Sequence, residues 1–279
     1  MSAERERVSK SFNGVVETVC ENKVYQIVLN QPESRNPLSK EMIDGLGHAL
    51  QVGIGHPTAR VIVFSARGRA FCAGGNLSNV AERLAEPAGP DGRDPIAVNN
   101  RVYGYLLERI IKCPKPTVAM VQGAAMGGGA GLACATDIVI ASQASFFGFP
   151  EARIGLVPAQ ILPFVVGRIG LRHARRMFLT GERVSAAHAH LIGIVDYLED
   201  NTEMLEARLQ QVCKMLIQAG PNALANTKML LNDAFEMERW YEQGLSDFLD
   251  ESAEYFATQF RSEAQEGIAA AREKRQPNW

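Results

Sequence analysis

The chain has 279 residues and a formal net charge of −2, with 46% hydrophobic and 22% charged residues. This length and composition predict a globular protein with a sizeable core, and they give no indication of a nucleic-acid partner. The five cysteines are scattered and form no Cys-x-x-Cys pair, which predicts reduced thiols in a cytoplasmic protein. Residues 1–11 are polar and no apolar run reaches ~18 residues, so we expect neither a signal peptide nor membrane insertion.

The first third of the chain alternates between strand and helix patterns. Residues 15–19 and 24–29 are rich in β-branched side chains and predict two paired strands around a short turn. A helix is expected from Lys40 to about Val52, because Ser39 can cap it and apolar side chains recur on one face. Residues 61–64 predict a short buried strand.

Further along, the pattern continues and then changes. A helix is expected over 102–110, and strands over 117–122 and 138–140, whereas residues 86–95 are dense in Pro, Gly and Asp and predict a loop. This alternation indicates an α/β fold with largely parallel sheets. From about residue 201 the signals are helical only, over 201–217, 222–237, 240–258 and 260–274. We therefore divide the chain into a core, 1–200, and a helical region, 201–279, that covers a face or joins subunits.

Two glycine-rich stretches stand out, Phe-Cys-Ala-Gly-Gly-Asn-Leu at 71–77 and Met-Gly-Gly-Gly-Ala-Gly-Leu at 126–132, each after an apolar run. Glycines at a strand-to-helix junction leave backbone N–H groups free and allow a ligand to approach. Two such junctions facing one oxygen would form an oxyanion hole, and tight helix–strand packing is the alternative. A dinucleotide fingerprint fails because Cys134 holds the closing glycine position, and no Gly-Lys-Ser/Thr phosphate loop is present.

Other catalytic residues are few. A nucleophilic role for Cys72 is a weaker interpretation than a buried core thiol. A metal-binding role for His188 and His190 is likewise weaker than an ordinary place in an alanine-rich helix. Glu151 follows a Phe-Gly-Phe-Pro turn and precedes apolar residues, which would raise its pKa and suit a general acid or base. The alternative is a surface glutamate paired with Arg153.

The assembled motifs resemble the crotonase superfamily of enoyl-CoA hydratases and isomerases over nearly the whole chain. The matching segments are Ser34–Leu38, Phe71–Leu77, Lys115–Thr117, Val121–Gly123, Gly127–Gly129, Asp137-Ile138, Phe147–Glu151, Leu179–Arg183, Ala186–Val195 and Glu266–Trp279. The resemblance implies a crotonase-like (ClpP/crotonase) α/β spiral of ββα units with a helical C-terminal trimerisation region, forming a homotrimer or a hexamer built as a dimer of trimers. It implies an acyl-CoA thioester as substrate and no cofactor beyond that coenzyme A, and no metal.

Residue by residue, the resemblance assigns Gly75 and Gly128 as the oxyanion-hole donors and Glu151 as the acid/base. It assigns to the adenine and pantetheine groove Ser34, Arg35, Pro37, Ala73, Asn76 and Leu77. Typical hydratases carry another glutamate two residues after the glycine triplet, where this chain has Gly131. Its absence is expected to leave space for a bulkier acyl group or a second water. Pro158 and Gln160 replace residues of a commoner Pro-Gly-x-Gly stretch and are expected to reshape the acyl pocket.

Gly131-Leu132 together with residues 153–164 look more like bacterial 3-methylglutaconyl-CoA and isohexenylglutaconyl-CoA hydratases, which act in leucine and acyclic terpene catabolism. The leading hypothesis is therefore hydration of a β-branched 2-enoyl-CoA with Glu151 as the single carboxylate. An enoyl-CoA isomerase and a non-catalytic acyl-CoA-binding paralogue are the alternatives, and a dehydratase or decarboxylase acting on a carrier-bound acyl group stays open.

Overall fold

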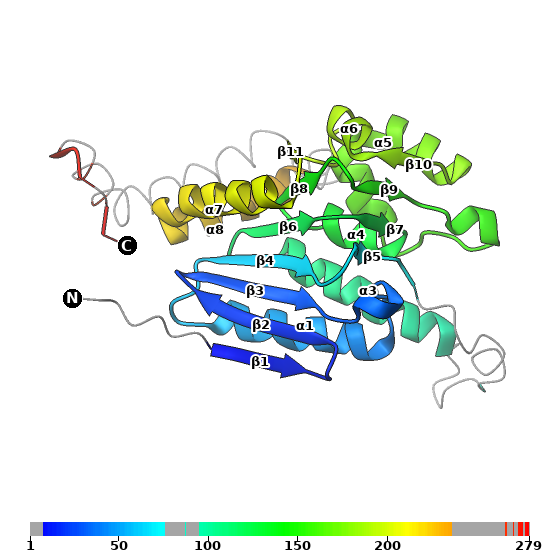
Figure 1. Cartoon of the computed structure of the whole chain (residues 1–279), viewed down its shortest axis with the longest axis horizontal. Helices are drawn as coiled ribbons and strands as arrows, with labels where there is room; N and C mark the ends of the chain where they lie inside the picture. The colour runs from blue at the N-terminus through cyan, green and yellow to red at the C-terminus, as the bar shows by residue number, and fades with distance from the viewer. Residues whose placement is uncertain are drawn as a thin grey trace.

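The computed structural model describes residues 8–75 and 95–235, together with residues 87, 266, 270, 273–275, 277 and 278. Within them the chain forms a large mixed sheet, a small sheet beside it, and helices around both (Figure 1). The large sheet has the order β1 (Val8–Phe12), β2 (Val16–Glu21), β3 (Val24–Leu29), β4 (Val61–Ala66), β6 (Thr117–Val121), β8 (Ile138–Ser142), β11 (Tyr197–Glu199). The small sheet has the order β10 (Arg183–Ser185), β9 (Phe146–Gly148), β7 (Ala124–Met126), β5 (Ala70–Cys72).

The helices follow from the same alternation. They are α1 (Lys40–Gly55), α3 (Pro95–Ile111), α4 (Gly128–Cys134), α5 (Leu162–Thr180), α6 (Ala186–Leu191), α7 (Thr202–Gln218) and α8 (Pro221–Phe235), with the 3₁₀ helices η1 (Pro32–Ser34) and η2 (Glu151–Ile154). The expected cap of α1 is confirmed, because the Ser39 side chain accepts a hydrogen bond from the Met42 N–H at 3.2 Å. No helix of the described residues is long and apolar enough to cross a membrane.

The pairing of the large sheet confirms the expected α/β class. The strands β1, β2 and β3 are antiparallel neighbours, and every later pair in this sheet, from β3–β4 to β8–β11, is parallel. The turn between β2 and β3 has positive φ at Asn22 (51°) and Lys23 (65°), which suits a tight hairpin. The strand β1 was not predicted from the sequence.

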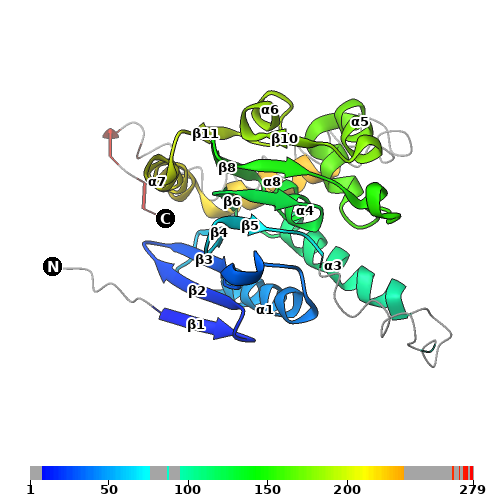
Figure 2. The same ribbon diagram turned by 45° about the vertical axis from the view of Figure 1, so that its right-hand side comes forward.

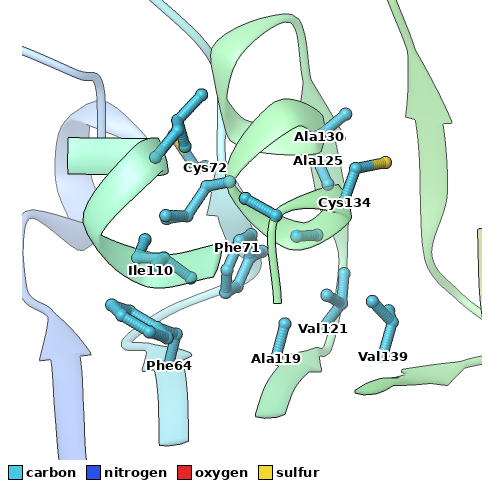
Figure 3. Close-up of a cluster of buried hydrophobic side chains, with 14 of the residues drawn as sticks. Phe64, Phe71, Cys72, Ile110, Ala119, Val121, Ala125, Ala130, Cys134 and Val139 are labelled. Carbon is cyan, nitrogen blue, oxygen red and sulfur yellow. The ribbon is translucent and has the colours of Figure 1, made fainter. Parts of the chain in front are cut away.

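The large sheet has two apolar faces. Alternate residues of a strand point to opposite sides, so in β4 Val61 and Val63 face one layer and Ile62 and Phe64 face the other. The first layer is α7, which contributes Leu205 among others. The second layer contains α1, α3, α4 and the small sheet, and Figure 3 shows the Phe71 ring of β5 among its side chains. The α7 helix therefore covers one face of the sheet, as Figure 2 also shows.

The helices α7 and α8 confirm the expected helical segments over 201–217 and 222–237. The two further segments, 240–258 and most of 260–274, lie outside the described residues, as does most of the expected loop 86–95. The division of the chain near residue 200 stays a prediction.

Candidate active site

Three short parallel strands of the small sheet end at one edge. The register pairs Cys72 of β5 with Ala125 of β7, and Met126 of β7 with Gly148 of β9. Each strand then runs directly into a segment singled out from the sequence: Gly74-Gly75, Gly127-Gly128 and Pro150-Glu151. The carboxyl ends of parallel strands are where α/β proteins gather their functional groups, so this edge is the candidate site. The sequence did not predict β5 and β7, because three residues are too few to show a period.

The first glycine junction is held against the second. Gly74 has a φ of +97°, and a methyl group added to it would lie 2.8 Å from the carbonyl oxygen of Met126. Only glycine allows both this conformation and this approach. Gly75 is exposed, and no described atom would lie within 4 Å of a methyl group placed on it. Among the described residues, nothing on this side of Gly75 blocks the approach of a ligand.

The second junction brings a carboxylate to the glycine triplet. Gly127, with a φ of +51°, donates its N–H to the Gly148 carbonyl at 2.8 Å. A methyl group on Gly127 would lie 2.7 Å from the Glu151 Oε1 atom, so the carboxyl group sits directly against this glycine. Gly128 is the first residue of α4, where the N–H groups have no acceptor within the helix. Glu151 and a free backbone donor are thereby neighbours.

Leu38 connects the two junctions, a role that the sequence did not indicate. Its N–H donates to the Gly74 carbonyl at 2.9 Å, and Leu38 forms a parallel bridge with Gly75. Its Cδ1 atom would lie 2.5 Å from a methyl group on Gly128. Leu38, which is buried, thus contacts Gly75 through its backbone and Gly128 through its side chain, and these are the two glycines that are predicted to share an oxygen.

Glu151 begins η2 and is half-buried. The preceding Phe149 is fully buried and packs on Phe178 of α5, with ring centroids 4.8 Å apart, which anchors the turn. Burial raises the pKa of the Glu151 carboxyl above its ordinary value, and its Oε2 atom has no hydrogen-bond partner among the described residues. Arg153 instead donates to the Thr180 carbonyl at 2.8 Å, so the alternative of a Glu151–Arg153 surface pair is wrong for the described structure.

Tyr103 of α3 is a second residue that the sequence did not indicate. Its hydroxyl donates to the carbonyl oxygen of Gly128 at 2.5 Å, and its side chain is buried. The ring approaches Gly128 from the α3 side, since its Cε1 atom would lie 3.4 Å from a methyl group there. The neighbouring position, Val102, belongs to the apolar stripe predicted for this helix, and nothing in the local pattern distinguishes Tyr103 from it.

The space expected at Gly131 is filled. A methyl group on Gly131 would lie only 2.2 Å from Cγ2 of Ile161, which is itself buried, so the expected room for a bulkier acyl group or a second water at this position is wrong. Gln160 lies alongside, where its amide donates to Asn100 of α3 at 3.0 Å and accepts from Arg101 at 3.4 Å. The segment from Pro158 to Ile161 therefore packs onto α3 and α4.

Some of the residues that are predicted to line a coenzyme A groove lie close together in the structure. Ser34, Arg35 and Ala73 are exposed, Pro37 is half-buried, and the Ala73 N–H donates to the Arg35 carbonyl at 2.9 Å. Asn36, fully buried among them, holds the segment by donating to the Arg67 and Ala70 carbonyls, each at 3.0 Å. Asn76 and Leu77 lie outside the described residues.

The weaker candidates remain weak. Cys72 is fully buried beneath Gly129, and burial raises the pKa of its thiol to about 12, which leaves it protonated and unreactive. His188 contacts Arg176 and His190 contacts the Val195 carbonyl, both in or near α6. The described residues contain no group of three side chains arranged to hold a metal ion.

Comparison with known proteins agrees with this geometry. The model of the enoyl-CoA hydratase/isomerase family matches residues 20–279. The chain belongs to the enoyl-CoA hydratase/isomerase family. A crystal structure of a family member from Marinobacter aquaeolei has 35% sequence identity and a TM-score of 0.87, and the match covers 95% of this chain and 98% of that one.

Two relatives from Escherichia coli show the range of reactions among similar members of the enoyl-CoA hydratase/isomerase family. A 1,2-epoxyphenylacetyl-CoA isomerase is 31% identical over 93% of this chain and 95% of its own length. A 2,3-dehydroadipyl-CoA hydratase is 30% identical over 93% of this chain and 96% of its own length. The crotonase-like fold expected from the sequence is confirmed, and a family enzyme acting on an acyl-CoA thioester is consistent with the site.

Proposed function

We propose that this chain adds water to a 2-enoyl-CoA, with Gly75 and Gly128 as oxyanion-hole donors and Glu151 as the acid/base. The observation that carries the proposal is the placement of the Glu151 carboxyl against Gly127, one residue from the Gly128 donor. Leu38 supports it by touching both Gly75 and Gly128. A basic group beside a pair of N–H donors is the minimum that addition to a conjugated thioester needs.

The reaction follows from these groups. The thioester oxygen accepts from the two backbone N–H groups, which draws electron density away from C3 of the substrate. Ionised Glu151 takes a proton from water while the water oxygen bonds to C3 and the π electrons move onto the thioester oxygen. The enolate then returns its electrons to C2, which takes the proton from Glu151 on the same face. Water is added across the double bond, with no redox change and no cofactor.

Glu151 is the one carboxylate that the described residues bring to this site, which distinguishes it from the two-glutamate pattern. Gly131 occupies the other position and is closed by Ile161, so both proton transfers fall to Glu151. We propose a β-branched acyl group, in keeping with the resemblance of Gly131-Leu132 and residues 153–164 to methylglutaconyl-CoA and isohexenylglutaconyl-CoA hydratases. The exposed Ser34, Arg35 and Ala73, with the half-buried Pro37, are proposed to line the coenzyme A groove, together with Asn76 and Leu77.

A double-bond isomerase is the second candidate, favoured by the same single carboxylate, which can carry a proton between C2 and C4. The two are separated by incubating the purified protein with enoyl-CoAs in H₂¹⁸O and analysing products by mass spectrometry. The panel contains straight-chain, β-methyl and β-carboxymethyl acyl groups. Hydration predicts ¹⁸O in a 3-hydroxyacyl product, strongest for a β-branched substrate. Rearrangement without ¹⁸O contradicts hydration, and calorimetric binding without any turnover indicates a non-catalytic paralogue.

We further propose that the protein is a cytoplasmic homotrimer or dimer of trimers. The support is the resemblance together with a helical C-terminal region whose described part leaves Met204, Met215 and Leu231 exposed. Multi-angle light scattering tests this proposal, which predicts three or six chain masses. A monomer or a dimer contradicts it.

A further inference from the structure

The oxyanion-hole segment contains three consecutive glycines, Gly127 to Gly129. Such a run has no Cβ atoms to restrict its backbone, so its conformation has to be imposed by neighbouring groups. Leu38 packs on Gly128 from one direction, and the Glu151 carboxyl lies against Gly127. Cys72 lies beneath Gly129, where its carbonyl oxygen would be 2.5 Å from a methyl group. These contacts restrict where the glycines lie, but none of them is a hydrogen bond to Gly128.

Tyr103 supplies that hydrogen bond. Its hydroxyl donates to the Gly128 carbonyl at 2.5 Å, a short distance for O–H···O. The Gly128 carbonyl belongs to the peptide unit that follows the Gly128 Cα, and the Gly128 N–H belongs to the unit that precedes it. The hydrogen bond from Tyr103 therefore anchors the Cα that both units share, while the bond from the Gly127 N–H to the Gly148 carbonyl anchors the preceding residue. Tyr103 is 7% exposed, and it belongs to α3, which precedes the glycine stretch in the sequence.

The surroundings of Tyr103 show that it lies close to the reacting groups. Burial raises the pKa of its phenol well above the ordinary value, and the neighbouring Cys72, Cys134 and Glu151 groups raise it further. The hydroxyl therefore stays protonated and remains a donor throughout the working pH range.

We propose that Tyr103 is a positioning residue that holds the Gly128 N–H in the direction required to bind the thioester oxygen. This inference rests on the proposed function, because it assumes Gly128 is an oxyanion-hole donor. A donor misplaced by a fraction of an ångström stabilises the transition state less, while the affinity for the ground-state substrate changes little.

The test replaces the hydroxyl alone. Tyr103→Phe keeps the ring, and Tyr25→Phe is the matched control, because Tyr25 is another buried tyrosine, in β3 against α1. Two measurements are made on each protein. The first is kcat and KM for enoyl-CoA hydration. The second is the infrared carbonyl frequency of bound [1-¹³C]butyryl-CoA, a saturated thioester that cannot be hydrated. If Tyr103→Phe fails to fold, 3-fluorotyrosine introduced at position 103 takes its place.

The proposal predicts that Tyr103→Phe lowers kcat about 10-fold, less than the 10²–10³-fold typical of losing a donor outright, with KM within about twofold. The carbonyl frequency shift on binding should fall by about half, and Tyr25→Phe should change neither quantity. An unchanged kcat and frequency shift, an effect on KM alone, or an equal loss in Tyr25→Phe would overturn it. The infrared shift does not depend on turnover, so absence of hydration by the wild type refutes the hydratase and leaves the role of Tyr103 tested.

Discussion

The neighbours of Glu151 hold its carboxyl group in place and partly shield it from water. The buried Phe149 anchors the strand end on α5, Pro150 turns the chain, and the carboxyl is left against Gly127 with its Oε2 atom without a partner among the described residues. Burial disfavours the ionised form, which is a feature of groups tuned for proton transfer.

A stability prediction follows from this residue. Because burial raises the Glu151 pKa in the folded state, the native protein binds that proton more tightly than the unfolded chain does. The resulting loss of stability appears as the pH rises from the ordinary carboxyl value through the folded pKa, and it is complete above both. We expect Glu151→Gln to raise the melting temperature by about 1–3 °C at pH 7 and by less near pH 4, as measured by calorimetry. A lower melting temperature at pH 7 contradicts this account of the site.

The same direction of shift predicts the pH dependence of the reaction. Glu151 must be ionised to take a proton from water, so kcat/KM should fall on the acid side with an apparent pKa above the ordinary value of 4.5. A pH–rate profile from pH 4 to 9 measures this limb. Its midpoint at or below 4.5 would show that the titrating group is not this carboxyl.

At the scale of elements, the helix α4 is rich in glycine because other elements pack closely against it from several sides. Leu38, Cys72 and Ile161 each occupy the place where a side chain on Gly128, Gly129 or Gly131 would lie. Tight packing and the presentation of N–H donors are therefore not alternatives for residues 126–132. The small size of the glycines allows the close packing of α4, and this packing brings its free N–H groups to the proposed site.

The contact between Gly131 and Ile161 can be tested directly. Gly131→Ala places a methyl group 2.2 Å from Ile161 Cγ2, and overpacking of this kind costs about 1–3 kcal/mol. In an Ile161→Ala background the same change should be better tolerated, giving a coupling energy of at least about 1 kcal/mol in urea unfolding. Gly55→Ala, which has no atom within 4 Å of the new methyl group, is the control and should be close to neutral. Additive effects at 131 and 161 would contradict the packing described here.

Among the described elements, the sequence predicted helices α1, α3, α7 and α8, but it did not predict α5, the longest helix, or the residues that support the site. Helix α1 has a clear apolar period and a serine cap, and strands β3 and β4 are marked by runs of apolar residues. Glu151 and the glycines stand out because of the residues around them. Strands β5, β7 and β9 have three residues each, which is too short for a pattern. Leu38, Tyr103 and Ile161 act through contacts with residues far away in the sequence, and such contacts leave no local signal.

At the scale of the whole molecule, the large sheet lies between two apolar layers, and the small sheet presents its strand ends as the site (Figure 1). One consequence concerns the thiols, because all five cysteines are buried and none of them forms a disulfide. Burial raises the pKa of Cys72 and of Cys134 to about 12 and that of Cys213 to about 11. Native protein should therefore react slowly with a disulfide reagent such as DTNB, and five equivalents should react in guanidinium chloride. A rapid single equivalent with loss of activity, prevented by acyl-CoA, would contradict the inert role of Cys72.

The central claim is that one carboxylate, Glu151, performs both proton transfers in hydration. Its most direct test is kcat for hydration of a β-branched 2-enoyl-CoA by the wild type and by Glu151→Gln, which keeps the shape of the side chain and removes the base. Glu199→Gln is the control, because Glu199 is a buried glutamate of β11 that forms an ion pair with Arg208 of α7. We predict a loss of about 10²–10⁴-fold for Glu151→Gln and less than about twofold for Glu199→Gln. Near-full activity of Glu151→Gln would contradict the account.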